Sequence, residues 1–208
     1  MLSFSIRKVL QALYYIQQRS RKDYQSHMYF IKMMYFADRH HLRHHGITIS
    51  GDKYVAMKMG PVASATLDIL KRRMPKSANS IEYDQLRAIE NVDEYNVLIK
   101  KQGEDELSES NKVSLDFAID EFGALDQFEL SDISHDYPEW FKHEDEIQYS
   151  LEHKGNRLSF PIPLEDFFED PIELPNLLKI RGTSKDPYFE GDKEFLNAMK
   201  ESVHEATC

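Results

Sequence analysis

The spacing of apolar residues predicts a mainly helical chain. Over residues 3–18 they recur at three- and four-residue steps, which is the pattern of a helix that buries one face. A second helix is expected to begin after Ser26, a favourable N-cap, and to end at Gly46, which tolerates the left-handed conformation common at helix ends. Its segment 28–37 is apolar on nearly every side apart from Lys32. We therefore expect this helix to form the buried centre of the fold.

Two later segments have the composition of β-strands. Residues 53–58 follow a Ser-Gly-Asp turn signal and precede Gly60-Pro61, which should break the strand and start a helix over 62–73. Residues 95–100 form the second strand and the expected partner of the first. The predicted fold class is therefore α+β, predominantly α-helical, with a helical core around a central buried helix and a small antiparallel β element.

The middle of the chain is expected to contain a linker and three helices. Residues 75–92 have mostly the composition of a linker. A longer helix should begin at Ser108 and end at Gly123, and two short helices should follow over 129–134 and 138–143. The apolar positions of the longer helix are Val113, Phe117, Ile119 and Phe122.

The composition changes after these helices. Five of the eight prolines lie between Pro161 and Pro187, among acidic and aromatic residues, and only 195–203 has a helical pattern. We expect two parts: a domain over residues 1–150, and a Pro-rich acidic C-terminal extension over residues 151–208 that packs on the core or on a partner.

The size and composition are those of a globular protein. The 208 residues are 41% hydrophobic and 12% aromatic, which is enough to build a core without disulfides or metal. No apolar run approaches the roughly twenty residues that a membrane helix needs, and the N-terminal pattern is not that of a signal peptide. Cys208 is the only cysteine, which excludes an intramolecular disulfide and a cysteine-based metal cluster. We expect a soluble, cytoplasmic protein.

The net charge of −10 is divided unevenly along the chain. Residues 1–76 contain 14 Lys and Arg against 4 Asp and Glu, whereas residues 77–208 contain 12 against 32. Such a division is compatible with one surface that binds an anionic ligand and another that binds a basic partner. The simpler interpretation is that the two halves attract each other in the folded domain and that the excess acid favours solubility.

The densest group of metal-ligating side chains is the histidine cluster His40–His45. Two pairs in it have i,i+4 spacing, which can place two imidazoles on one metal ion, so a metal-dependent hydrolase is one hypothesis. The interleaved Arg39 and Arg43 would repel a cation, however, and the glutamate of the His-Glu-x-x-His motif is absent. A solvated helix end with a favourable dipole explains the cluster more simply.

No other catalytic pattern is present in the sequence. It contains neither the Gly-x-Ser-x-Gly elbow of a serine hydrolase nor the Gly-rich loop of a phosphate-binding site. Ser134, His135 and Asp136 are adjacent, but catalytic triads are built in space, so adjacency does not indicate one. These patterns therefore supply no predicted catalytic residue and no predicted metal ligand.

A DNA-binding transcriptional regulator is the main alternative from another class. The basic N-terminal face around Arg39 and Arg43 could contact phosphates. No helix-turn-helix, zinc-finger or RNA-recognition signature is present, and the sequence pI of about 5.4 is low for a dedicated nucleic-acid binder. Nucleic acid is therefore the less favoured partner.

Four pieces of the sequence resemble one known family. Met33-Met34-Tyr35-Phe36-Ala37-Asp38 is followed by Gly51-Asp52-Lys53-Tyr54-Val55-Ala56, by Gly60-Pro61-Val62, and later by Leu130-Ser131-Asp132-Ile133-Ser134-His135 with Pro138-Glu139-Trp140. In this order and spacing they resemble the Panacea (SocA-like) antitoxin domain, also described as phage-associated GepA-like proteins. The resemblance covers roughly the first 145 residues. Met33-Met34 stands where the family usually has leucines, a change that conserves volume.

The resemblance implies the antitoxin of a toxin–antitoxin or phage-defence pair. Such a protein neutralises a cognate protein toxin by direct protein–protein binding, so the resemblance implies that it is not an enzyme and that it uses no cofactor and no metal. A further route that the resemblance implies is delivery of the toxin to a protease, with the antitoxin as adaptor. The proline-rich extension could then determine which toxin is bound. No membrane partner is expected, and the sequence leaves the oligomeric state open.

The four pieces also supply the candidate site residues. Strand alternation places Tyr54 and Lys58 on one face, where an amphipathic tyrosine and a long lysine could anchor an interface. Tyr54 could equally cover the buried helix. The predicted partner-binding residues, which include two from the late piece, are Asp52, Tyr54, Lys58, His135 and Trp140. The predicted structural residues of the motif are Tyr35, Asp38, Gly51, Gly60, Pro61 and Val62.

Overall fold

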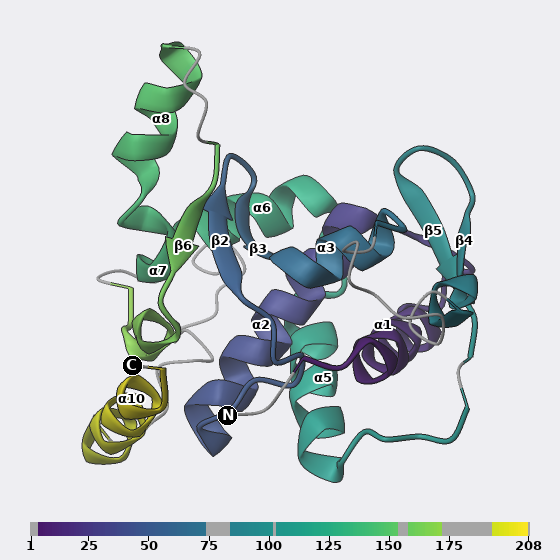
Figure 1. Ribbon diagram of the computed structural model, residues 1–208, viewed down its shortest axis with the longest axis horizontal. Helices are drawn as coiled ribbons and strands as arrows, with labels where there is room; N and C mark the ends of the chain where they lie inside the picture. The colour runs from purple at the N-terminus through teal and green to yellow at the C-terminus, as the bar shows by residue number, and fades with distance from the viewer. Residues whose placement is uncertain (1–3, 74–83, 102, 154–157, 172–192, 208) are drawn as a thin grey trace.

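Helix α2 (His27–His45) runs through the centre of the fold (Figure 1). The computed structural model describes residues 4–73, 84–101, 103–153, 158–171 and 193–207. The hydroxyl of Ser26 accepts a hydrogen bond from the amide of Tyr29 at the start of α2, and Gly46 ends the helix with a left-handed φ of 71°. Every residue from Tyr29 to Arg39 is buried. The prediction of a central buried helix is therefore confirmed.

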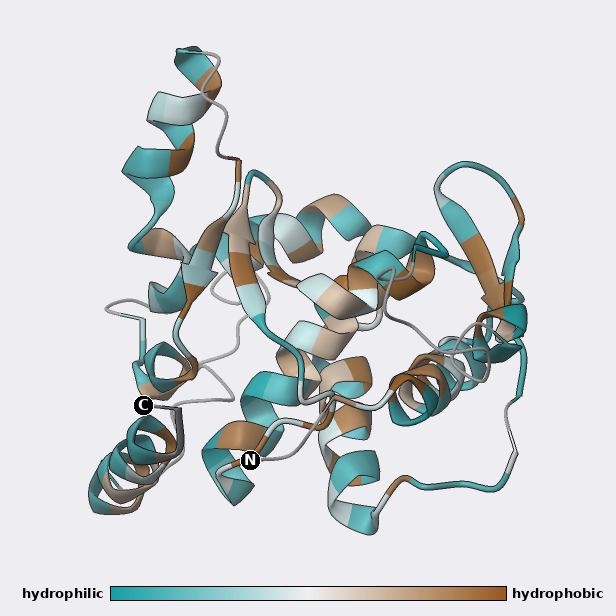
Figure 2. Ribbon diagram, in the orientation of Figure 1, coloured by the Kyte–Doolittle hydropathy of each residue, from teal (hydrophilic) through white to brown (hydrophobic). Residues whose placement is uncertain are grey.

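Three longer helices pack around α2. They are α1 (Ile6–Ser20), α5 (Glu109–Phe122) and α6 (Gln127–His135). The hydroxyl of Ser108 caps α5 as expected, and the side chain of Asn111 completes a capping box. Apolar residues gather along α1 and strand β5, whereas α8 and α10 are mostly hydrophilic (Figure 2). The shorter or peripheral helical segments are α3 (Ser64–Leu70), α7 (Pro138–Phe141), α8 (Glu144–Glu152), α10 (Lys193–Thr207) and the 3-10 turns η1 (Leu86–Ala88) and η2 (Leu164–Phe168).

Two small antiparallel sheets complete the fold, which is therefore α+β and mainly helical, as predicted. One has the order β1-β5-β4, the other β3-β2-β6. The strands of the first sheet are β1 (Gln25–Ser26), β4 (Ile89–Asn91) and β5 (Asn96–Ile99). Those of the second are β2 (Tyr54–Met57), β3 (Gly60–Ala63) and β6 (Phe160–Ile162). None of the described helices combines the length and the apolar character needed to cross a membrane.

The expected pairing of the two predicted strands is wrong. Strand β2 pairs on one side with β3 and on the other with β6, so it has no edge left for residues 95–100. Strand β5 lies instead between β1 and β4. Its connection to β4 is a short turn in which the carboxylate of Asp93 accepts hydrogen bonds from the amides of Tyr95 and Asn96.

The expectation that Gly60-Pro61 breaks the strand and starts a helix is also wrong. Both residues belong to β3, which forms a hairpin with β2 around a two-residue turn at Lys58 and Met59. Pro61 can occupy a strand here because β3 lies at the edge of its sheet, where a missing N–H leaves no partner unsatisfied. The helix begins only at Ser64, after β3.

The prediction of a linker over residues 75–92 is wrong for the end of this range. Residues 89–91 form β4, and residues 75–83 lie outside the described part of the chain. Helix α8 was not predicted.

The described parts of 151–208 contact the rest of the fold closely. Strand β6 extends the second sheet, and the fully buried ring of Phe167 packs against the rings of Tyr35 and Tyr54. Helix α10 packs on η2. The division into a domain and an extension stays a prediction, and its residues 154–157, 172–192 and 208 lie outside the described ranges.

Candidate functional site

The hairpin of β2 and β3 is the point at which the four sequence pieces converge. Ser131 of α6 donates its hydroxyl to the carbonyl oxygen of Met59 at 3.0 Å, and the indole N–H of Trp140 donates to that of Met57 at 2.8 Å. Lys32 of α2 donates to the carbonyl oxygen of Pro61 at 3.4 Å. Helices α2, α6 and α7 thus hold the hairpin through its backbone carbonyl oxygens. Two of these three hydrogen bonds come from the late sequence piece, from Ser131 and Trp140.

Gly60 allows this close approach of the hairpin to α2 and α6. Its φ of 98° is a conformation that side-chain-bearing residues rarely adopt. A Cβ atom at this position would also overlap Nζ of Lys32 and Oγ of Ser134. Both facts require glycine, which gives Gly60 a structural role.

Asp38 and Tyr54 are tied together in the core. The hydroxyl of Tyr54 donates to Oδ2 of Asp38 at 2.7 Å, and the amides of Ile49 and Ser50 donate to Oδ1 at 2.7 and 3.0 Å. The hydroxyl of Ser50 donates to Oδ2 as well. Burial raises the pKa of Asp38 to about 6, although these hydrogen bonds oppose the shift. The pair fixes the loop before β2 onto the central helix.

Asp52 serves as the cap of α3. Its Oδ2 accepts hydrogen bonds from the amide and the hydroxyl of Thr66 at 2.7 and 2.8 Å, and its Oδ1 accepts from the amide of Ala65 at 3.0 Å. The residue at the N-cap position itself, Ala63, has no side chain that could do this. The Gly51-Asp52 piece therefore positions α3 beside the hairpin.

A buried ion pair links α2 to α7. Nε of Arg39 lies 2.8 Å from Oε1 of Glu139, and the hydroxyl of Tyr35 donates to the same oxygen at 2.7 Å. The guanidinium also lies over the ring of Tyr137, 4.6 Å from its centroid. Both charged side chains are 0% exposed. The pair anchors the segment that carries Trp140, and Trp140 in turn hydrogen-bonds to the hairpin at Met57.

The predicted partner-binding residues lie at very different depths. Asp52, Tyr54 and Trp140 are buried, with 5%, 2% and 5% of their surface exposed. His135 is half-buried and stacks on the ring of Trp140 with centroids 3.7 Å apart. Of these five residues, Lys58 is the exposed one, at the turn of the hairpin. The buried residues can influence a partner only through the hairpin that they hold, whereas Lys58 can touch one.

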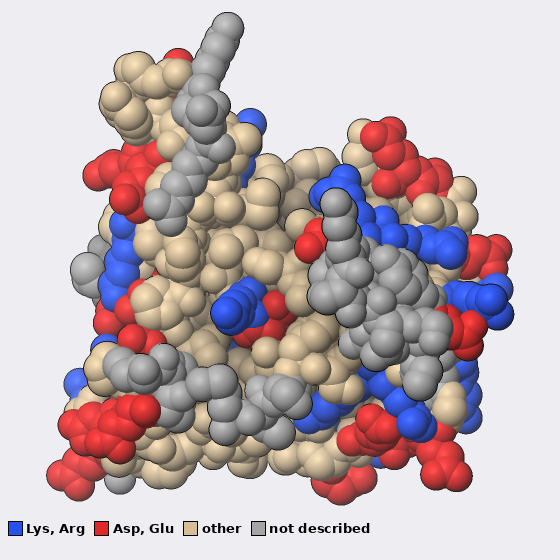
Figure 3. Space-filling model, viewed as in Figure 1, with Lys and Arg blue, Asp and Glu red and all other residues tan. Residues whose placement is uncertain are grey.

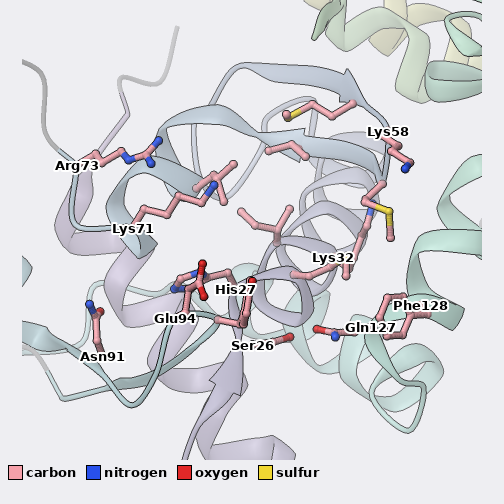
Figure 4. A pocket seen from close by; sticks show the side chains of 17 residues that line it. Ser26, His27, Lys32, Lys58, Lys71, Arg73, Asn91, Glu94, Gln127 and Phe128 are labelled. Atoms are coloured by element: carbon pink, nitrogen blue, oxygen red, sulfur yellow. The ribbon is translucent and has the colours of Figure 1, made fainter. Parts of the chain in front are cut away.

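The exposed side of the hairpin forms one wall of a groove with a volume of about 860 Å³ (Figure 4). Its floor is apolar, and the β4–β5 turn and the start of α6 supply two exposed aromatic rings, Tyr95 and Phe128. Lys32 and Lys58 lie at one end in Figure 4, and Lys71 and Arg73 lie at the other. The apolar lining residues are Met28, Ile31, Met57, Met59, Val62 and Leu67.

The polar groups of the groove have unusual surroundings. Lys32 is 1% exposed, and its ammonium is 2.9 Å from the hydroxyl oxygen of Ser134, a neutral partner. Burial lowers the pKa of Lys32 to about 7. The pKa of the adjacent His135 is lowered to about 4, mainly by burial and to a lesser extent by the charge of Lys32. Nε2 of His27 and of His135 are buried and have no hydrogen-bond partner among the described residues.

The Lys32–Ser134 contact has the composition of a serine–lysine dyad but not its accessibility. The hydroxyl of Ser134 donates to the carbonyl oxygen of Ser131 at 2.7 Å, and the residue is 0% exposed. A nucleophile must reach its substrate, and this hydroxyl faces the protein interior. The neighbours His135 and Asp136 form no triad with it in the contacts that the structure describes.

The histidine cluster is divided between the core and the surface. Nδ1 of His41 lies 2.7 Å from the carbonyl oxygen of Ile47, and the side-chain amide of Asn111 donates to Nε2 at 3.0 Å, which fixes a neutral tautomer. His40 stacks on Phe117. Burial lowers the pKa of His40 to about 3 and that of His41 to about 4. Among the described residues no three His, Cys, Asp or Glu side chains could share a metal ion.

The cations next to the cluster also face inward. Arg39 pairs with Glu139, and Nη2 of Arg43 lies 2.5 Å from Oδ1 of Asp170. Further pairs join Arg7 to Glu106 and Arg19 to Asp116. The basic and acidic halves of the chain therefore attract each other within the fold. Acidic side chains gather on projecting elements such as α8 and α10 (Figure 3).

Sequence reasoning missed most of the groove. Lys32 was visible as the charged exception in an apolar segment, but Lys71, Arg73, Tyr95 and Phe128 carry no local signal. They meet only because the β4–β5 turn, α3 and α6 come together in space.

The fold is a mainly helical one in which the sequence motif holds a hairpin at the edge of a groove. The family model described as "Antitoxin SocA-like, Panacea domain" matches residues 30–141. The chain belongs to this family, as its motif predicted. No match was found among curated proteins, and none among solved structures.

Proposed function

We propose that this protein is the antitoxin of a toxin–antitoxin or phage-defence pair and that it neutralises a cognate protein toxin by binding it in the groove. The family supports an antitoxin role in general. The single observation that favours the groove is the convergence of the sequence motif on its wall, where buried motif residues hold Met57, Lys58 and Met59 in place. Neutralisation by contact needs no catalysis and no cofactor, and we propose a cytoplasmic site of action.

Two other observations support a binding surface at this place. The groove exposes aromatic rings, 66% of Tyr95 and 57% of Phe128, which would lose contact with water in a complex. Lys58 on its wall belongs to the same motif and is the exposed member of the predicted partner-binding residues. The adaptor route, in which the toxin is handed to a protease, would use the same first contact.

DNA binding receives less support from the geometry. Arg39 and Arg43, which the alternative placed on a phosphate-binding face, are buried in ion pairs. His40 and His41 are neutral at physiological pH because of their burial. Within the described ranges, the two arginines at the end of α2 are therefore not available to follow a phosphate backbone.

Co-expression tests the proposed function. The product of the neighbouring gene is induced in a naive host with and without this protein, and growth is followed. Arrest by the neighbour alone and recovery with the antitoxin support the proposal. A harmless neighbour, or arrest that persists when both proteins are present, contradicts it.

A further inference from the structure

The floor of the groove suits aliphatic and aromatic side chains of a partner. Met28, Met57 and Met59 contribute flexible thioether side chains that adjust to different shapes. Ile31 and Val62 are nearly fully buried below them, so the floor is backed by the core. A surface of this kind gains free energy mainly by burying apolar groups.

The exposed cations of the groove have no ion-pair partner among the described residues, unlike several cations elsewhere in the protein. Elsewhere Arg7, Arg19, Lys112 and Lys142 lie within ion-pair distance of carboxylates. Lys58, Lys71 and Arg73 form no ion pair in the part of the chain that the structure describes, although the protein has a net charge of −10. These three cations are therefore open to the carboxylates of a partner, although one carboxylate, Glu94, also lines the groove.

Two buried polar groups beneath the exposed groove cations also favour a ligand that carries carboxylates. The ammonium of Lys32 has only the neutral acceptors Ser134 and Pro61 among its described hydrogen-bond partners. Nε2 of His27, which lines the groove, is buried and has no partner among the described residues. One carboxylate, Glu94, lines the groove, and Figure 4 shows it near His27. The lining is therefore basic overall and contains donors that a carboxylate could accept from.

We infer that the groove binds an acidic, amphipathic segment of a protein partner, with apolar side chains on the methionine floor and carboxylates on Lys58, Lys71 and Arg73. The inference rests on the proposed function for its assumption that the partner is a protein, and it adds the chemistry of the segment. Lys32 lies beneath the floor, and because burial lowers its pKa to about 7 it carries only part of a positive charge near neutral pH. The phosphates of a nucleic acid could pair with Lys58, Lys71 and Arg73, but a nucleic acid would place no aliphatic group on the apolar floor.

A displayed library of random 12-residue peptides tests this chemistry without a known toxin. Peptides are selected on the full-length protein and compared with those retained by two charge-matched variants. Lys58→Glu/Lys71→Glu reverses two groove charges, whereas Lys22→Glu/Lys53→Glu reverses two exposed charges outside the groove. We expect selection of peptides that combine Asp or Glu with Leu, Ile, Phe or Met.

The selected peptide then gives a dissociation constant by fluorescence anisotropy. We expect the groove variant to weaken binding about tenfold or more and the control variant to leave it within about twofold. Lys32→Met should also weaken binding. Failure to select a groove-dependent peptide, binding that persists when the peptide's acidic residues become Gln or Asn, or displacement by a 20-nucleotide single-stranded DNA at 150 mM salt would overturn the inference.

The peptide selection and the growth assay can fail separately, so their results distinguish this inference from the proposed function. Neutralisation without selection of acidic peptides would leave the antitoxin role intact and place the toxin elsewhere on the protein. Selection of acidic peptides by a protein that protects against no neighbouring toxin would leave the groove chemistry intact and refute the proposed function.

Discussion

The ammonium of Lys32 lies 2.9 Å from the hydroxyl oxygen of Ser134, and this contact joins the first turns of the central helix α2 to the end of α6. Gly60 of the hairpin passes beside both atoms. The lysine is therefore buried against neutral groups at the base of the groove. A buried ammonium without a carboxylate is costly, and its retention is understandable if the charge serves binding and not stability.

The cost can be measured with Lys32→Met, a substitution that keeps the length and removes the charge. Burial holds the pKa of Lys32 at about 7, below its ordinary 10.5. Between these values the unfolded chain binds a proton that the folded protein does not, so the stability of the wild type rises with pH across this window. Below pH 7 the full penalty is present. We expect Lys32→Met to be more stable than the wild type by about 2–4 kcal/mol at pH 6, with the difference shrinking toward pH 10.

Urea unfolding at a series of pH values gives this difference directly. His135, the other buried titratable group beside Lys32, has a pKa of about 4 and stays neutral throughout the series. Lys53→Met is the matched control, since Lys53 is exposed. A Lys32→Met variant that is less stable than the wild type at pH 6 would show that the ammonium is a stabilising group.

Gly60→Ala tests the packing of the hairpin against Lys32 and Ser134. The new methyl group would occupy the space of Nζ and Oγ, and the positive φ would add backbone strain. We expect a loss of about 2–4 kcal/mol in the free energy of unfolding. Gly103→Ala is the control, because its φ is also positive at 46° while its nearest neighbour is the movable guanidinium of Arg7. That variant should lose about 1 kcal/mol. Equal losses in the two variants would mean that the close approach at Gly60 is unimportant.

Glu139→Gln tests the ion pair with Arg39. Removal of one charge leaves the guanidinium buried without its carboxylate, which typically costs about 3–5 kcal/mol. The double variant Arg39→Met/Glu139→Leu removes both charges and should recover much of the loss, because no charge then stays buried. Thermal and chemical unfolding of the single and double variants provides the comparison. A double variant less stable than Glu139→Gln would indicate that the pair itself is strongly stabilising.

The sequence was informative where one helix or one cap decides the structure. The buried face of α2, its Ser26 cap and its Gly46 end follow from local spacing and residue type, and so does the Ser108 cap of α5. The motif resemblance likewise identified the residues that surround the hairpin, although it did not separate those that hold it from those that face a partner.

Local pattern was misleading where contacts between distant segments decide the structure. Val113 has an apolar side chain but is 58% exposed, whereas Asn111 and Ser114 are buried on the same helix. The reason is that these two polar side chains hydrogen-bond to His41 and His40 on α2. The inward face of α5 thus combines these two polar side chains with the buried apolar residues Leu115, Ala118 and Phe122.

The β-strands depended even more on distant partners. Gly60-Pro61 was expected to end a strand because glycine and proline weaken strands in general. The hydrogen bonds from α6 and α7 to Met59 and Met57, and the edge position of β3, stabilise a hairpin there instead. Tyr54, expected as an interface or a core residue, lies in the core, where its hydroxyl donates a hydrogen bond to Asp38.

The most direct test of the central claim is toxin neutralisation by groove variants. The neighbouring gene's product is induced together with the wild type, with Lys58→Glu/Lys71→Glu, or with the control Lys22→Glu/Lys53→Glu, at equal protein levels and with folding verified by circular dichroism. We predict that the groove variant fails to restore growth and no longer co-purifies with the toxin, while the control does both. Full protection by the groove variant would contradict the claim that this groove binds the toxin.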